Sequence, residues 1–329
     1  MDLRPLVQIL ADGGFHSGHS LGRQLGTTRT IIGQQVEVLR DMGVEVHSVT
    51  GKGYRLPTLF EPLSRSAILH LMREYSALWA SRFDLKFSTG STNADAMEKA
   101  RLGESRYLVL AEHQTAGRGR RGKEWVSPLG ANIALSVLWT FDLPLAALEG
   151  LSLAVASMVV EGLGNAGYQG GIGLKWPNDI LLNGAKLAGI LIEISGDVNG
   201  PARVVIGVGI NVRMPYFCLQ KIDQVYTDLA SNFELSPDRN RIVARVLSAL
   251  SAGLPRFAEH GFSAFRDSWN ALDVYRGRQV CISSGKHRTI GVAMGVSEAG
   301  ELVLDTASGR QLIAGGEMTP SLRPVEGVS

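Results

Sequence analysis

The chain has 329 residues, 45% of them apolar, so it is too long for one typical domain and apolar enough for two or three with substantial cores. Its formal net charge of +2 excludes a global electrostatic field as the source of nucleic-acid binding, which would require a local basic face. The two cysteines, Cys218 and Cys281, lie far apart with no flanking histidine pattern, so the sequence predicts neither a disulfide framework nor a zinc site. This fits a reducing, cytoplasmic setting. We expect no secretory leader, and because the sequence has no uninterrupted apolar run of membrane-spanning length, we expect no membrane partner.

Residues 1–56 are expected to form a small helical module closed by a β-hairpin. Apolar residues recur at helical spacing from Leu3 to Leu10, a second short helix is expected from Ser20 to Gly26, and Thr28 caps a third. The apolar stripe of the third helix comprises Ile31, Ile32, Val36, Leu39 and Met42. Two helices joined by a tight turn, followed by a hairpin, are typical of a winged helix-turn-helix.

The residues expected to face DNA are Thr28, Arg29, Thr30 and Gln34, with Lys52 at the tip of the wing. The alternative is a three-helix packing domain with no nucleic-acid partner. Gly33 lies inside the expected recognition helix, where glycine costs about 1 kcal/mol relative to alanine.

Changes in the sequence pattern along the chain predict three domains. Pro57 and Pro62 bound a linker, and residues 63–82 have the pattern of a fresh amphipathic helix. Strands and helices then mix up to about residue 271, whereas the last segment contains short strands separated by glycine turns, as in a small β-barrel. We therefore expect an α+β protein with domains at 1–62, 63–271 and 272–329.

The most informative segment is residues 114–125, QTAGRGRRGKEW, which follows an apolar strand-like run. Glycine lets the backbone approach a ligand closely, while Arg118, Arg120 and Arg121 supply planar donors that are always charged. The segment predicts a loop that binds phosphate or carboxylate. An alternative is a disordered RNA-binding tail, but Trp125 and the apolar run 132–139 bracket the loop with folded structure.

Four further motifs are weak when taken singly. Lys175-Trp176-Pro177-Asn178-Asp179 can be an ordinary turn, and Lys186 can be an exposed flank of the apolar strand that follows it. Ser91-Thr92-Asn93 can simply cap a helix, or it can bind a polar head group there. The strand 205–211 contains Gly207 and Gly209, which often indicates close approach of a ligand or another backbone.

In this order and at these spacings, these segments resemble the biotin protein ligase family. The resemblance implies a central mixed α/β ligase domain of the class II aminoacyl-tRNA-synthetase/biotin ligase type. The first 56 residues look like the winged helix of the subgroup that also represses biotin synthesis genes, and Gly315-Gly316-Glu317 resembles the family's C-terminal SH3-like barrel. The resemblance covers nearly the whole chain.

The family resemblance implies an ATP- and magnesium-dependent enzyme that makes biotinyl-5'-AMP and transfers biotin to a lysine of the biotin carboxyl carrier domain of acetyl-CoA carboxylase. It implies catalytic roles for Lys186, Arg118, Arg120, Arg121 and Asp179. It also implies biotin or ATP contacts for Ser91, Thr92, Asn93, Gln114, Gly117, Arg118, Gly119, Arg120, Lys186, Gly189, Gly207, Trp125, Asn211, Tyr226 and Arg323. No protein ligand for a metal is assigned. The remaining partners are operator DNA and a second copy of the chain when adenylate is bound.

The resemblance also implies how individual residues act. Arg118 and Gln114 contact biotin together with residues 91–93, Arg120 holds the loop over the adenylate, and Lys186 bonds the carboxylate or the phosphoryl oxygen. Asp179 orients or deprotonates the incoming lysine. Trp125 and Tyr226 pack on adenine, and Arg323 reaches the ATP phosphates. In this chain, more residues separate Arg323 from Glu317 than in the family pattern. Two other functions stay open: a DNA-binding biotin sensor with little ligase activity, and a lipoate-type protein ligase.

Overall fold

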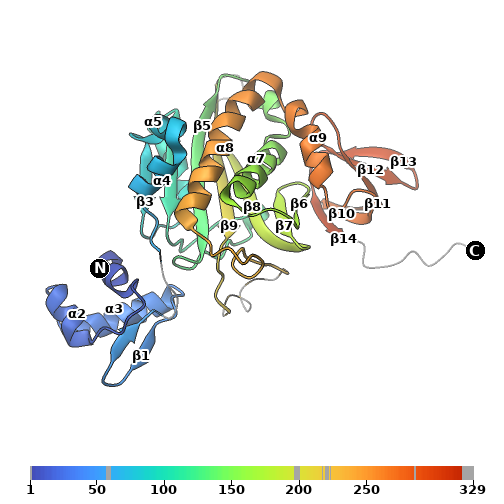
Figure 1. The fold of residues 1–329 in the computed structure, drawn as a ribbon. Coiled ribbons are helices and arrows are strands. Elements are labelled where there is room, and N and C mark those ends of the chain that lie inside the picture. The colour runs from blue at the N-terminus through green and yellow to red at the C-terminus, as the bar shows by residue number, and fades with distance from the viewer. Residues whose placement is uncertain are drawn as a thin grey trace, which may run out of the picture.

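The computed structural model describes residues 2–56, 61–195, 201–216, 218, 222, 224–284 and 287–320. The N-terminal module consists of α1 (Arg4–Leu10), α2 (Gly18–Gln24), α3 (Arg29–Asp41) and the antiparallel hairpin of β1 (His47–Val49) and β2 (Gly53–Arg55) (Figure 1). Thr28 caps α3 by accepting a hydrogen bond from the Ile31 amide. The predicted helix-turn-helix with a wing is confirmed.

Two details of this module differ from the prediction. Helix α2 begins at Gly18, earlier than expected, because the Ser17 side chain accepts a hydrogen bond from the Ser20 amide and caps it. Ile31 was expected in the apolar stripe, but its side chain is 37% exposed, whereas Ile32 and Val36 are fully buried. Ile31 therefore lies on the outer side of α3.

The central part is built on a mixed seven-stranded sheet with strand order β3-β4-β5-β9-β8-β7-β6. Strands β3 and β4 are parallel and all other neighbours are antiparallel. The strands are β3 (Phe83–Lys86), β4 (Arg106–Ala111), β5 (Asn132–Phe141), β6 (Ile172–Lys175), β7 (Asp179–Leu182), β8 (Ala185–Ser195) and β9 (Ala202–Asn211).

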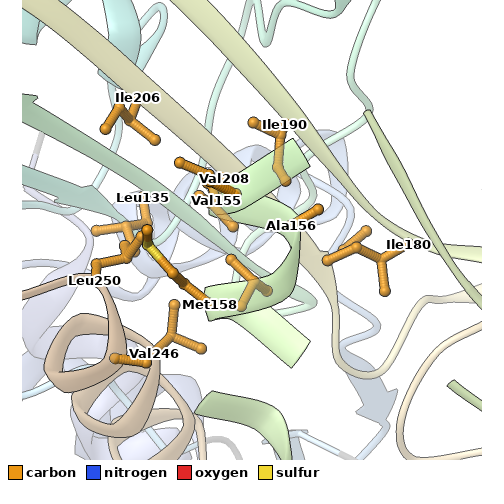
Figure 2. Packing of buried hydrophobic residues seen from close by; sticks show 14 of the residues in the cluster. Leu135, Val155, Ala156, Met158, Ile180, Ile190, Ile206, Val208, Val246 and Leu250 are labelled. Carbon is orange, nitrogen blue, oxygen red and sulfur yellow. The ribbon is translucent and has the colours of Figure 1, made fainter. Parts of the chain in front are cut away.

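Helices α7 (Leu151–Ala166) and α8 (Arg239–His260) form the main core with this sheet. In Figure 2, Met158 of α7 lies among Leu135 of β5 and Val246 and Leu250 of α8. The segment Leu145–Ala166 is long and apolar enough, by length and composition, to cross a membrane, although the sequence contains no uninterrupted run of that kind. Of its most apolar window, 56% is buried here, as in the core helix of a globular domain.

The other helical elements are α4 (Arg65–Met72), η1 (Arg73–Tyr75), α5 (Ser76–Trp79), α6 (Thr92–Arg101), η2 (Arg120–Gly122), η3 (Leu145–Leu148) and α9 (Ser263–Leu272). The single helix predicted over residues 63–82 is wrong. Arg73 has a φ of 52°, in the left-handed region, so the chain turns there and continues as two short pieces.

The C-terminal part is a five-stranded antiparallel sheet with order β13-β12-β11-β10-β14, consistent with the predicted SH3-like barrel. Its strands are β10 (Gln279–Ser284), β11 (His287–Val296), β12 (Leu302–Thr306), β13 (Gly309–Ile313) and β14 (Glu317–Pro320). Trp176 donates a hydrogen bond from Nε1 to the Gly300 carbonyl at 3.1 Å, and this fastens the sheet to the central part. Residues of β14 consequently reach the central pocket.

A buried ion pair fastens the linker that follows the N-terminal module. Arg239 Nη1 lies 2.7 Å from Glu112 Oε2, and the two side chains are only 5% and 6% exposed. Glu112 also accepts a hydrogen bond from the Leu63 amide, and Arg239 Nη2 donates to the Glu61 carbonyl at 2.7 Å. The end of the linker is therefore held between β4 and α8.

Candidate active site

The separate motifs meet at one pocket of about 140 Å³ beside β8 and β9. It is lined by residues of the loop before α6, the arginine-rich loop, the Lys175–Asp179 turn and the two strands. The predicted site residues that line it are Ser91, Thr92, Asn93, Gln114, Arg118, Gly119, Arg120, Arg121, Trp125, Asp179, Lys186, Gly189 and Gly207. Segments distant in sequence thus form a single cavity.

The arginine-rich loop folds back on itself as an irregular hairpin. The Trp125 amide donates to the Gly117 carbonyl at 2.9 Å, and the Gly119 amide donates to the Lys123 carbonyl at 2.7 Å. A Cβ on Gly117 would lie 2.3 Å from the Trp125 carbonyl oxygen, so only glycine allows the two arms to approach this closely. The shape of the loop is therefore fixed by its own backbone contacts.

Glycines in β8 and β9 make the floor of the pocket. Gly189 and Gly209 are cross-strand partners, and the Trp125 ring lies against both. A Cβ on Gly209 would lie 2.4 Å from Trp125 Cε2, and one on Gly207 would lie 2.3 Å from Asn93 Oδ1. The two glycines thus make room for side chains that reach the strand from other segments.

Neutral polar groups gather at the Asn93 end of this floor. The Thr92 amide donates to Gln114 Oε1 at 2.9 Å, which leaves the Nε2 group of Gln114 as a donor. Ser136 Oγ lies 2.6 Å from Asn93 Oδ1 and 2.8 Å from Thr92 Oγ1. The Asn93 oxygen can only accept, so Ser136 donates to it, and the Thr92 hydroxyl donates to Gln114 Oε1 at 3.2 Å. This buried chain fixes the orientation of both amide side chains.

Glu193 of β8 joins that network to the arginine-rich loop. Its Oε2 atom accepts from Asn93 Nδ2 at 2.8 Å and from Arg118 Nη2 at 3.0 Å. Sequence reasoning missed this carboxylate, because its partners lie 100 and 75 residues away.

Cations gather at the Lys186 end of the pocket. Lys186 Nζ lies 2.7 Å from Asp179 Oδ1, although without the angle of a directed hydrogen bond, and the two side chains are 16% and 15% exposed. Arg120 Nη1 donates to Asn178 Oδ1 at 3.2 Å, and burial lowers the pKa of Arg120. Burial also lowers the pKa of Lys175, which Asp179 opposes and Lys186 reinforces. Positive charge is thus held partly desolvated, where an anion would stabilise it.

The C-terminal sheet contributes Gly316, Glu317 and Met318 to the pocket lining. Lys123 of the arginine-rich loop donates a hydrogen bond to Glu317, and this contact lowers the pKa of the Glu317 carboxyl. Lys123, Lys175 and Glu317 were not predicted as site residues. The composition of the Lys175–Asp179 motif was the available signal for Lys175, whereas Glu317 is brought to the site only by the tertiary fold.

Some predicted residues support the pocket without lining it. Asn211 donates from Nδ2 to the carbonyls of Lys186 and Thr227, at 3.4 and 3.0 Å. Tyr226 forms a parallel bridge with Lys186, and burial raises its pKa. Gly117 lets the two arms of the arginine-rich loop approach each other but does not line the pocket. Arg323 lies outside the described residues. Within the described ranges, no group of three or more His, Cys, Asp or Glu side chains is arranged to hold a metal ion.

The predicted DNA-facing residues lie on the outer side of the N-terminal module. Arg29, Thr30 and Gln34 are exposed on α3, and Lys52 is exposed at the hairpin tip. Thr28 is also exposed, but its hydroxyl oxygen is engaged in capping α3. Of these predicted residues, Arg29 and Lys52 carry positive charge.

Comparison with known proteins agrees with this geometry. The chain is 38% identical to the bifunctional ligase/repressor BirA of Salmonella typhimurium over 98% of this chain and 97% of the relative. The chain belongs to the biotin protein ligase family. The bifunctional ligase/repressor BirA of Bacillus subtilis is 32% identical over 93% of this chain and 94% of its own length. A model of the biotin/lipoate A/B protein ligase family matches residues 87–211 of this chain, and an HTH domain model matches residues 3–55.

A solved structure of this family, the Aquifex aeolicus biotin protein ligase in complex with biotin and ATP, superimposes with a TM-score of 0.59. It is 26% identical in sequence and covers 72% of this chain and 97% of its own. The match agrees with the fold described above.

Proposed function

We propose that this protein is both a biotin ligase and a transcriptional repressor and that it acts in the cytoplasm. As a ligase it activates biotin with ATP as biotinyl-5'-AMP and transfers the biotin to a lysine of a carrier domain. The observation that supports this most directly is the gathering of Arg120, Lys175 and Lys186 at one end of a pocket whose other end is lined by neutral hydrogen-bonding groups. In the first step a carboxylate must approach the α-phosphate of a polyanion. Preorganised cations offset the repulsion between them.

Each charged donor has a separate role in this proposal. Lys186 binds the carboxylate or phosphoryl oxygen, Arg120 and Arg121 bind the phosphates, and Gly119 lets the backbone approach them. Losing one such donor typically costs about 3 kcal/mol in the transition state. At the neutral end, Gln114, Asn93 and their neighbours bind the polar head of biotin.

The second step needs a neutral amine to attack the mixed anhydride. Asp179 lies against Lys186, so a phosphoryl oxygen that engages Lys186 leaves the Asp179 carboxylate to orient the incoming lysine. The amine attacks the biotinyl carbonyl carbon, an amide bond forms, AMP leaves, and the proton passes to Asp179 or to water. The acceptor is proposed to be the biotin carboxyl carrier domain of acetyl-CoA carboxylase.

The nucleotide is proposed to lie along Trp125, with Tyr226 closing on the adenine from the segment next to Lys186 and Arg323 reaching the phosphates. Magnesium enters with ATP, since Mg²⁺ is usually held through substrate phosphates and one or two carboxylates. Glu124, Asp179 and Glu317 are carboxylates that line the pocket, and Asp179 and Glu317 each face a lysine. These carboxylates are better suited to a metal ion that arrives bound to the phosphates than to one that the protein holds permanently.

The repressor half of the proposal rests on the winged helix and on one exposed strand edge. Arg29 and Lys52 are placed to meet phosphates, with Thr30 and Gln34 beside them. β7 pairs with β8 only up to Gly189, so within the described ranges residues 191–195 have no strand on that side, and Ile194 is 46% exposed. We propose that this edge pairs two copies when adenylate is bound. We also propose that the three domains meet at residues 62/63 and 271/272.

One experiment tests the enzyme. The protein is incubated with biotin, magnesium and α-labelled ATP, bound biotinyl-adenylate is sought, and an apo carrier domain is then added. Transfer to the carrier supports the ligase, and adenylate without transfer favours a sensor. Labelling with lipoate in place of biotin would identify the related lipoate chemistry instead.

A further inference from the structure

Glu193 does not line the pocket itself, yet it contacts Asn93 and Arg118, which do. Alternate residues of a strand face the same side, so Gly189, Leu191 and Glu193 of β8 share the face on which the ligand pocket is built. Gly189 lies against the Lys186 side chain, and Glu193 lies against Arg118. At about 3.4 Å per residue, these two points are about 14 Å apart along the strand.

The two ends of the pocket therefore present different charge to a ligand. At the Lys186 end, the cations Arg120, Lys175 and Lys186 outnumber the carboxylates Asp179 and Glu317, and these groups influence one another electrostatically. At the other end Arg118 is matched by Glu193, whose Oε2 lies 3.0 Å from its Nη2. Without that carboxylate, Arg118 would be an unpaired cation, and the pocket would attract anions at both ends.

We propose that Glu193 is a specificity-determining residue, which sets the direction in which a carboxylate ligand enters by neutralising Arg118. A ligand with a carboxylate at one end and a neutral head at the other then binds one way round, with its carboxylate toward Lys186. The same neutralisation keeps phosphate groups away from the head-group end. This inference rests on the proposed function for the identity of the ligand, but the anion preference itself does not.

Glu193→Gln is the direct test, because glutamine keeps the side-chain size and an oxygen that accepts from Asn93. Arg118 then becomes a free cation at the head-group end. Binding of inorganic pyrophosphate, measured by calorimetry without other substrates, is expected to tighten by about threefold, as for a partly exposed charge pair. The double variant Arg118→Gln/Glu193→Gln should lose that gain.

Turnover gives a second, independent readout. Biotin bound the wrong way round is unproductive, so kcat and KM for biotin should fall together while kcat/KM stays unchanged. Biotinamide, which has no carboxylate, should inhibit wild type and Glu193→Gln equally. Glu298→Gln is the matched control, because it removes the same charge from an exposed pair with Arg266 and should change nothing.

Two results would overturn the inference. One is unchanged pyrophosphate affinity in Glu193→Gln. The other is an equal loss of affinity for biotin and biotinamide with a raised KM, which would mean that Glu193 only supports the floor through Asn93. A wild type that forms no adenylate would instead refute the proposed function, and the calorimetric comparison would still decide the role of Glu193.

Discussion

Gly207 and Gly209 allow the two halves of the pocket to be perturbed separately. They lie on the same face of β9, two residues apart, and neither has a positive φ, so alanine fits the backbone at both. At Gly209 the new methyl group would lie 2.4 Å from Trp125 Cε2, and at Gly207 it would lie 2.3 Å from Asn93 Oδ1. Gly209→Ala therefore displaces the proposed adenine platform, and Gly207→Ala displaces the proposed biotin contact.

The expected sizes follow from what each methyl group displaces. Stacking of a base on an aromatic ring is worth about 1–3 kcal/mol, so Gly209→Ala should raise the KM for ATP by about 5- to 150-fold. A net hydrogen bond is worth about 1 kcal/mol, so Gly207→Ala should raise the KM for biotin by about fivefold. Trp125 is only half buried and belongs to a loop, so it can move aside, and Gly209→Ala should cost about 1 kcal/mol of stability.

The assay is initial-rate adenylate formation with each substrate varied in turn, alongside urea unfolding of both variants. The crossed pattern is decisive, with Gly209→Ala acting on ATP and Gly207→Ala acting on biotin. The reasoning fails if both variants raise the same KM, or if either loses activity in proportion to lost folded protein.

Three other changes are expected to have distinct effects. Arg120→Gly should still make adenylate but release it when no carrier is present, which gel filtration with labelled ATP would detect, and wild-type retention would refute a lid role. Burial lowers the pKa of Lys175 below the unfolded value of about 10.4, so the unfolded chain binds more protons in the window below that pH. The free energy of unfolding should rise with pH there, and urea unfolding should show a smaller slope in Lys175→Met. Arg29→Ala should weaken specific and non-specific DNA binding alike and reduce the salt slope by about 1 in binding titrations, unless Arg29 reads a base edge.

Local features of the candidate site could be predicted where neighbouring residues act together. The glycine–arginine spacing and the thinning of β9 by glycine are local features, and each has a direct counterpart in the hairpin loop and the glycine floor. Helix details failed where one residue overrode the pattern. Arg73 breaks the predicted helix with a left-handed backbone, and Ile31 matches an apolar stripe although its side chain faces outward.

Roles that depend on a distant partner were not visible in the sequence. Glu193 stands at the end of an apolar strand, where a carboxylate usually indicates only the solvent boundary. Its meaning comes from Arg118 and Asn93, which the fold brings to within 3.0 and 2.8 Å. Glu317 is similar, since a separate sheet carries it to Lys123. Periodicity reports which face of an element is buried, but not what lies against it.

The same limit applies to the connection between the pocket and the N-terminal module. A buried ion pair is weak evidence for stability, so the Glu112–Arg239 pair is better understood through the linker backbone groups that both side chains also bind. Beside it, a series of hydrogen bonds joins the pocket to the winged helix. Asn211 donates to the Lys186 carbonyl, the Arg213 amide donates to the Ala131 carbonyl at 2.8 Å, and the Leu129 amide donates to the Met42 carbonyl at 3.1 Å.

Leu129 is also part of the apolar core of the N-terminal module, with only 4% of its surface exposed. The backbone around Lys186 is therefore connected, through Asn211 and Ala131, to a residue inside the winged-helix core. Coupling along such a route requires that its elements have two arrangements which ligand binding distinguishes. The segment around Tyr226 contacts this route at two points, because Tyr226 bridges Lys186 and the Thr227 carbonyl accepts a hydrogen bond from Asn211.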